Sequence, residues 1–239
     1  HPRFRYASQN GFIDPAKDLM RGAGLEWFSV QQWVAADQDG VTAAIVPVDA
    51  HLVTLGDIVR GAWPKEFGER KGTIFSYIMN NYWDTNWPAG QGGETRFRYV
   101  LTSGRNLSAG ALSRLGWEEM SPLEVDEIKP QDKAGAARGP LPPAQYSFLQ
   151  VDQPGVLLLT WKVAEDEKGT ILRFVEAAGQ SATVNVTVPF LKPEAAFSCN
   201  ALEENQQPLT VSPHGFSFPV KPYQIVTVRL EGRSILQLP

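Results

Sequence analysis

The second half of the chain is a series of short hydrophobic runs separated by turn signals. This regular spacing of predicted turns restricts the fold more than any other feature. The runs are rich in Val, Ile, Leu, Phe and Thr, and Gly-, Pro- or acid-rich segments separate them. Short strands at regular spacing are typical of an antiparallel β-sandwich. The predicted strands are 147–151, 156–163, 170–176, 182–188, 195–200, 216–220 and 224–230, with turns at 153–155, 165–169, 178–179, 203–207 and 213–215.

The first half also contains strand patterns. Runs at 27–34 and 41–46 flank Asp37-Gln38-Asp39-Gly40, where Gly suits the positive φ of a tight turn, so these runs predict a hairpin. Residues 1–26 contain two prolines and three glycines without sustained periodicity, and they predict irregular structure.

One helix is predicted at 108–119, with Ser108 as its N-cap, although Gly110 and Gly116 weaken its propensity. The predicted fold class is therefore all-β, an antiparallel β-sandwich with one short helix. Residues 129–143 are rich in Pro, Gly, Ala and charge and predict a linker. The expected organisation is a first β-sandwich portion at 1–128, a linker at 129–143 and a carboxy-terminal β-sandwich unit at 144–239.

Composition excludes several classes of function. The net charge is -4 and no basic stripe is present, so we expect no nucleic-acid partner. The hydrophobic runs are too short to cross a bilayer, so we expect no membrane partner. Cys199 is the single cysteine, which excludes an internal disulfide, and we expect it to be a small buried residue. The chain begins at His1 without Met, so we expect a processed or excised piece.

The stretch 72–103 holds the residues with the most chemistry. Hydrophobic residues from Ile74 to Met79 precede a polar and aromatic segment, a Gly-rich turn follows at 90–93, and alternation from Arg96 to Leu101 predicts a strand. Loops presented by a sheet commonly carry function. The candidate sugar-binding or domain-interface residues are Asn80, Asn81, Tyr82, Trp83, Asp84, Asn86, Trp87 and Gln91. The alternative is that the aromatic rings pack in the core and the amides satisfy backbone groups.

Catalytic and metal-binding patterns give no candidate residues. Asp49 and His51 alternate to one face of a strand, but a catalytic zinc takes three protein ligands, so a polar pair at a strand end is the better interpretation. Asp84 and Glu94 could face each other as paired carboxyl groups, but structural roles are the better interpretation there also. We therefore predict no catalytic residue, no metal ligand and no cofactor in this chain.

Several segments resemble the carboxy-terminal β-sandwich region of glycoside hydrolase family 38, the α-mannosidases, especially the bacterial members. The segments are IMNNYWDTNWPAGQGG (78–93), RFRYVLTS (96–103), SPLEV (121–125), ILRFVEAAGQ (171–180) and PYQIVTVRL (222–230). The likeness covers roughly residues 33–230. It implies part of a galactose-mutarotase-like supersandwich followed by a smaller β-sandwich. It also implies a zinc ion and an Asp nucleophile in an amino-terminal catalytic domain, which no part of this chain resembles.

The resemblance therefore implies a non-catalytic region of a hydrolase of α-mannosidic bonds. Its expected partner is the amino-terminal catalytic domain of the same parent chain, and an oligosaccharide is a second candidate partner. Two alternatives stay open, a free-standing carbohydrate-binding module and a purely structural interaction domain. The compartment is not determined by the sequence, with a secreted or periplasmic location slightly favoured.

Overall fold

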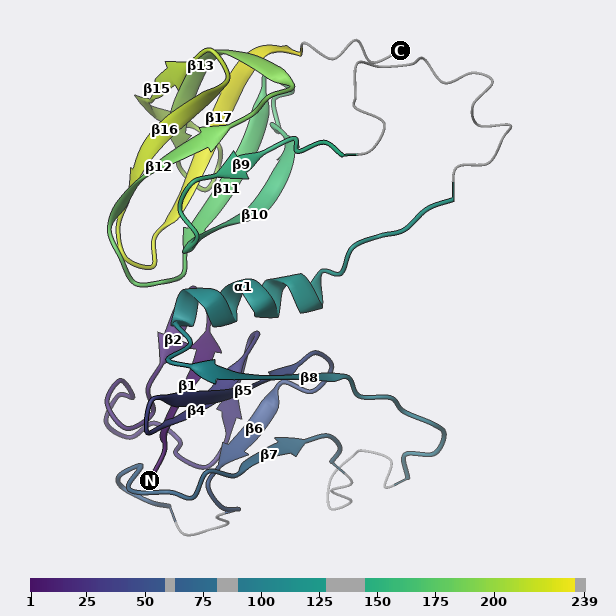
Figure 1. Cartoon of the computed structure of the whole chain (residues 1–239), viewed down its shortest axis with the longest axis vertical. Coiled ribbons are helices and arrows are strands. Elements are labelled where there is room, and N and C mark those ends of the chain that lie inside the picture. Colours follow the sequence, from purple (N-terminus) through teal and green to yellow (C-terminus); the bar gives the residue numbers. More distant parts are fainter. Residues whose placement is uncertain (59–62, 81–89, 128–144, 235–239) are drawn as a thin grey trace. The chain divides into compact units, whose positions relative to one another are not determined.

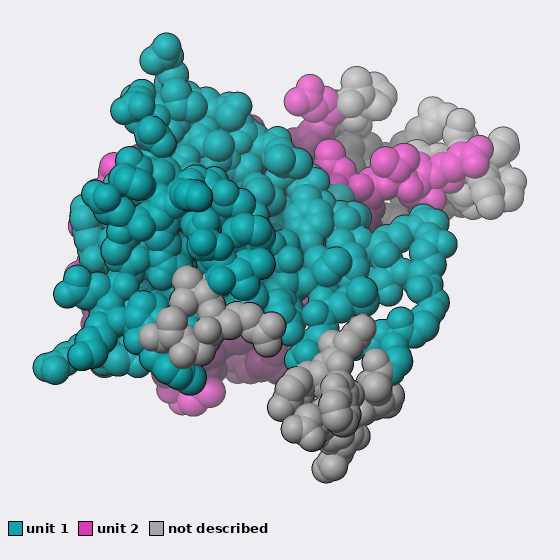
Figure 2. All heavy atoms as spheres, turned by 90° about the horizontal axis from the view of Figure 1, so that it is seen from below, with its two compact units in different colours: residues 1–122 teal, residues 123–239 magenta. Residues whose placement is uncertain are grey.

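The computed structural model describes residues 1–58, 63–80, 90–127 and 145–234. The chain divides into two compact units, residues 1–122 and 123–239, which are coloured separately in Figure 2. Antiparallel sheets and one helix make up the described structure, which confirms the predicted all-β class (Figure 1). No helix among the described residues is long and apolar enough to span a membrane.

The first unit contains two sheets and the helix. Sheet A has the strand order β2-β1-β4-β5-β8, and sheet B has the order β3-β6-β7. The strands of sheet A are β1 (Arg3–Ser8), β2 (Gly11–Ile13), β4 (Val34–Gln38), β5 (Val41–Pro47) and β8 (Tyr99–Arg105). The strands of sheet B are β3 (Phe28–Ser29), β6 (Leu52–Leu55) and β7 (Ile74–Tyr77), and the helix is α1 (Ala109–Met120).

Each face of sheet A carries an apolar cluster. Phe4 and Tyr6 of β1 pack with Phe28, Val53 and Leu55 of sheet B in one apolar cluster. The opposite face packs against α1 in a second cluster, in which Trp33 and Leu112 are buried. The hairpin predicted around residues 37–40 is confirmed, with Asp39 and Gly40 both at positive φ in a two-residue turn. Its first strand is β4, which replaces the predicted run 27–34, because residues 28–29 pair with β6 as β3 of sheet B.

The irregular structure predicted for residues 1–26 is wrong in part, because β1 and β2 lie within this range. Strand β1 lacks the alternation of buried and exposed residues that predicts a strand, because Phe4, Arg5, Tyr6 and Ala7 are all buried. Arg5 is held there by Asp37, whose carboxylate accepts from its Nε at 2.6 Å and from its guanidinium at 2.8 Å. A charged residue is stable in such a position because its partner is fixed on the neighbouring strand.

Helix α1 begins as predicted, since Ser108 accepts a hydrogen bond from the Ala111 amide at 3.1 Å. Its glycine at 116 has a packing role that outweighs its weak helix propensity. A Cβ at Gly116 would lie 2.5 Å from the Cβ of Gln32, so only Gly permits this close approach. The indole nitrogen of Trp33 donates to the Ser113 hydroxyl at 3.0 Å, which fixes the helix on sheet A.

The second unit is a sandwich of two sheets. Sheet C has the order β15-β16-β12-β9, and sheet D has the order β10-β11-β17-β13-β14. The strands of sheet C are β9 (Gln150–Val151), β12 (Ala182–Thr187), β15 (Thr210–Ser212) and β16 (Gly215–Val220). The strands of sheet D are β10 (Val156–Val163), β11 (Thr170–Glu176), β13 (Leu191–Cys199), β14 (Asn205–Pro208) and β17 (Ile225–Ser234). Phe174, Phe216 and Phe218 lie between the sheets in one core.

Most predicted strands of the second unit lie where expected, and one predicted turn is wrong in part. Residues 203–207 were expected to form a turn, but β14 begins at Asn205 and pairs with the end of β13. Every residue of β14 is exposed, so this edge strand lacks the apolar alternation from which a strand is predicted. The predicted linker, 129–143, lies entirely outside the described residues.

Candidate functional site

The candidate loop follows β7 and leads into β8. Of its predicted site residues, Asn80 and Gln91 are described, and the side-chain amide of Gln91 donates to the Asn80 carbonyl at 2.8 Å. This bond joins the two ends of the loop, and Gly93 turns the chain with φ at +100°. The other candidates lie outside the described residues, namely Asn81, Tyr82, Trp83, Asp84, Asn86 and Trp87.

An aspartate on the neighbouring connection anchors the returning end of the loop. The Asp49 carboxylate accepts from the Arg98 amide at 2.7 Å, from its Nε at 3.0 Å and from its terminal guanidinium nitrogen at 2.9 Å. The Val48 amide donates back to the Arg98 carbonyl at 3.1 Å. These bonds precede β8, which begins at Tyr99, so the strand predicted from Arg96 starts three residues later.

The outgoing end is anchored by side chains of β7. The hydroxyls of Ser76 and Tyr99 lie 2.8 Å apart in a hydrogen bond between the two sheets. The ring of Tyr77 meets that of Trp27 edge to face, with centroids 4.9 Å apart. Both ends of the loop are therefore held by contacts to sheets A and B, which is what a presented loop needs.

The ion pair with Arg98 also lowers the pKa of the Asp49 carboxyl group. Hydrogen bonds from the Arg98 side chain, and then from its amide, lower the pKa of Asp49 to about 2. The carboxylate is thus committed to Arg98, which argues against Asp49 as a metal ligand. The neighbouring His51 keeps a buried Nδ1 without a hydrogen-bond partner among the described residues. No group of three or more His, Cys, Asp or Glu side chains in the described part of the chain could hold a metal ion.

We expect Asp49→Asn to flatten the acid dependence of stability in the first unit. The pKa of Asp49 in the folded protein is about 2, below the unfolded value of about 3.9, so the ionised form stabilises the fold above pH about 4. That contribution is lost as pH falls from about 4 towards about 2. Thermal midpoints measured between pH 2 and pH 6 test this. An unchanged acid slope in Asp49→Asn would show that the ion pair does not contribute.

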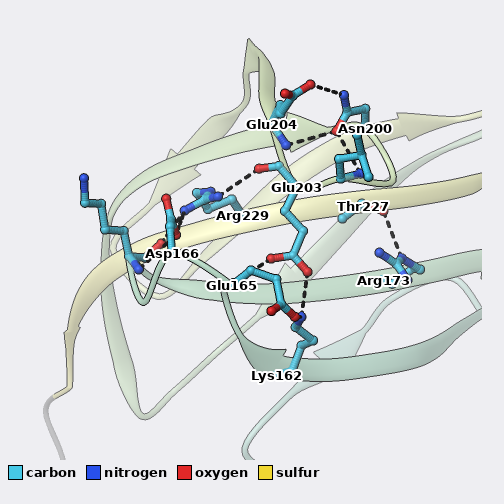
Figure 3. Close-up of polar contacts among 11 residues, drawn as sticks. Lys162, Glu165, Asp166, Arg173, Asn200, Glu203, Glu204, Thr227 and Arg229 are labelled. Carbon is cyan, nitrogen blue, oxygen red and sulfur yellow. Dashed lines mark hydrogen bonds and ion pairs between the residues drawn. The ribbon is translucent and has the colours of Figure 1, made fainter.

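A second polar cluster lies on sheet D of the second unit, at residues that no sequence motif singled out (Figure 3). The buried Arg229 of β17 donates to the Asp166 carboxylate at 2.6 Å, to the Lys168 carbonyl at 2.7 Å and to the Glu203 carbonyl at 2.8 Å. The Glu203 carboxylate in turn lies 2.8 Å from Lys162 and accepts from the Glu165 amide at 2.8 Å. Lys162 also pairs with Glu165.

This cluster connects the turn after β10 to the turn after β13. Hydrogen bonds from Lys162 and from the Glu165 amide lower the pKa of Glu203, and the bond from Arg229 lowers the pKa of Asp166. A surface depression of about 420 Å³ lies beside these residues. Because each carboxylate already has a cationic or amide partner, the cluster is built as a cross-link of two turns. Such pairs join residues distant in sequence, so no local pattern could have revealed them.

Cys199 is buried as expected, with its thiol 3.3 Å from the Asn205 side-chain oxygen. Arg96 and Arg98 are both exposed and both ion-paired, Arg96 with Glu94 at 2.9 Å and Arg98 with Asp49 at 2.9 Å. Glu94 is therefore engaged by Arg96, and its proposed partner Asp84 lies outside the described residues.

Comparison with known proteins identifies part of the chain. Residues 155–228 match the family model of the glycosyl hydrolases family 38 C-terminal beta sandwich domain. The fold resembles the crystal structure of an alpha-mannosidase from Enterococcus faecalis V583, with a TM-score of 0.62 and 16% sequence identity. The match covers 96% of this chain and 24% of that chain. A search of curated proteins finds no match.

The family 38 resemblance seen in the sequence is therefore confirmed, and the matched residues lie in the second unit. Two of the sequence segments that carry the resemblance meet in this sandwich. Glu176 in the first accepts from the Tyr223 amide in the second at 3.0 Å. The chain spans about a quarter of the length of the α-mannosidase it matches.

Proposed function

We propose that this chain is a non-catalytic carboxy-terminal β region of a glycoside hydrolase that resembles the α-mannosidases. It buttresses the catalytic domain of the parent protein, and its loop at 80–93 reaches the sugar site. The parent reaction is hydrolysis of α-mannosidic bonds. The observation that supports this proposal best is the match of nearly the whole chain to 24% of an α-mannosidase.

The zinc ion of this proposal belongs to the catalytic domain. The described residues do not fit it, because they offer no set of three His, Cys, Asp or Glu side chains, and Asp49 is bound by Arg98. In this proposal the chain takes no part in a chemical step of the reaction. Its contribution is positional, since contacts of Gln91, Arg98 and Tyr99 hold both ends of the loop.

Titration of the 239-residue chain with mannose, mannobiose and a wider glycan panel, followed by calorimetry, tests the proposal against its main rival. A loop that forms half of a site should give no saturable binding at millimolar sugar. Saturable binding that Trp87→Ala abolishes would favour a free-standing carbohydrate-binding module. Trp63→Ala is the control, because Trp63 is 82% exposed and outside the loop.

A further inference from the structure

Four aromatic side chains of the second unit contact one another in a chain of rings. The rings of Trp161 and Phe190 are stacked, with centroids 5.4 Å apart and planes 28° apart. Phe148 meets Phe190 edge to face at 5.8 Å, and Tyr146 meets Phe148 edge to face at 4.9 Å. Together these four residues form the ring cluster. They come from the segment before β9, from β10 and from the segment before β13.

The ring cluster is only partly covered. Phe148 is 41% exposed and Trp161 is 42% exposed, whereas Phe190 is half-buried against the core of the sandwich. Val163 lies two residues after Trp161 on the same face of β10, and it is 65% exposed. A group of exposed apolar side chains of this kind marks an interaction surface.

Trp161 and Val163 belong to the core face of sheet D. Trp161 pairs with Leu172 of β11, while Val163 pairs with Thr170, which in turn pairs with Leu230 of β17. Leu172 and Leu230 are buried in the core, and cross-strand neighbours share one face of a sheet. This face is therefore buried at β11 and β17 and left uncovered at its edge strand, β10.

Strand β17 ends beside the ring cluster. Its last residue, Ser234, pairs with Leu191, which directly follows Phe190. Phe190 spans the distance to the edge of the sheet, because its ring stacks on Trp161 of β10. Residues 235–239 lie outside the described residues, and their sequence is Ile-Leu-Gln-Leu-Pro. A short apolar segment thus follows β17 at the place where the apolar surface is uncovered.

The register of β17 shows which side chains of this segment suit the surface. Ser234 shares a face with its partner Leu191, and Leu191 belongs to the core. Because side chains alternate along an extended chain, a continuation of β17 would turn positions 236 and 238 to the core side. Both are leucines, and the polar Gln237 lies between them. A tethered segment also has an effective concentration on the order of millimolar, which favours it over a separate partner.

We infer that residues 235–238 dock on the ring cluster and cover the exposed end of the core face of sheet D. The side chains of Leu236 and Leu238 lie against its exposed rings, and Gln237 faces solvent. The docked segment ties the end of β17 to the segment that leads into β9. This docking needs only the chain itself, so it does not depend on the proposed function.

Nuclear magnetic resonance of the 239-residue chain tests the docking directly. The methyl resonances of Leu236 and Leu238 should lie upfield of their positions in a free peptide of residues 234–239, because aromatic rings shield the groups above them. They should also show nuclear Overhauser effects to Trp161. Trp161→Ala should remove most of the upfield shift. Trp117→Ala is the matched control, since Trp117 is a partly exposed tryptophan of the first unit, and it should leave the shift unchanged.

Hydrogen exchange supplies a second readout that changes no described residue. Amides at 146–149 should exchange about tenfold faster or more when Leu236→Lys and Leu238→Lys are combined, because the charged groups abolish the docking. Leu202→Lys is the control, since Leu202 is exposed elsewhere on the second unit, and it should leave this exchange unchanged.

Four results would overturn the inference. The first is leucine methyl resonances at the positions of the free peptide, and the second is exchange at 146–149 that the combined lysine variant leaves unchanged. Upfield shifts that disappear on dilution would assign the ring cluster to a second copy of the chain. A Trp161 indole resonance that moves with added mannobiose, with the leucines at their peptide positions, would assign it to an oligosaccharide.

Discussion

Glu176→Ala is expected to destabilise the second unit by about 3–5 kcal/mol. The Glu176 side chain is 2% exposed, and its carboxylate accepts from the amides of Ala178 at 2.8 Å, Gly179 at 2.8 Å and Tyr223 at 3.0 Å. Removing the carboxylate leaves three backbone N–H donors without their acceptor, and each unsatisfied donor costs about 1–3 kcal/mol. Water that enters the vacated space would reduce this cost. The carboxylate thereby joins the turn after β11 to the turn before β17.

Denaturant dependence of hydrogen exchange at residues 170–176 and 225–230 measures this loss within the second unit. Glu176→Gln should cost less, about 1–3 kcal/mol, because one oxygen acceptor remains. Glu204→Ala is the control, since Glu204 is exposed and, among the described residues, its carboxylate accepts a hydrogen bond only from Asn200. Equal losses in Glu176→Ala and Glu204→Ala would contradict this assignment.

Trp33→Ala is expected to destabilise the first unit by about 3–5 kcal/mol. The Trp33 side chain is fully buried between sheet A and α1 and donates to Ser113. The Arg5 guanidinium lies 5.7 Å from its ring centroid, so the substitution also removes a cation–π contact. The cavity would lie beneath the helix, and α1 should lose protection from exchange before the strands of sheet A.

Trp117→Ala provides the matched comparison for Trp33. Trp117 lies near the end of the same helix and is 37% exposed, so its loss should cost about 1 kcal/mol or less. Exchange at residues 34–38 and 109–120 reports both variants. A Trp117→Ala loss as large as that of Trp33→Ala would show that the helix is not held mainly through Trp33.

The same four residues, Arg-Phe-Arg-Tyr, occur twice in the chain and show the limit of local patterns. At residues 3–6 they form β1, and Arg5 is buried against Asp37. At residues 96–99 both arginines are exposed, and β8 begins only at Tyr99. The alternation is identical, so the difference arises from the partner strands. The partner Asp37 lies far from Arg5 in sequence, which no window of residues could reveal.

The second unit was more predictable because its strands are long and their turns are marked. The strands β10 and β11 lie within the predicted ranges, with a turn at Gly169 where φ is +86°. The candidate loop was predictable as a segment, but the contacts that hold its two ends were not. Asp49 and Arg98 are 49 residues apart, and their pairing depends on how β5 and β8 align.

We propose that this chain assists a glycosidase and does not itself hydrolyse mannosides. The most direct measurement compares release of 4-nitrophenol from 4-nitrophenyl α-mannoside, with zinc present, by the 239-residue chain and by the complete parent polypeptide. We predict turnover by the parent and none by the chain, whether or not zinc is added. Sustained turnover by the purified 239-residue chain would contradict the claim.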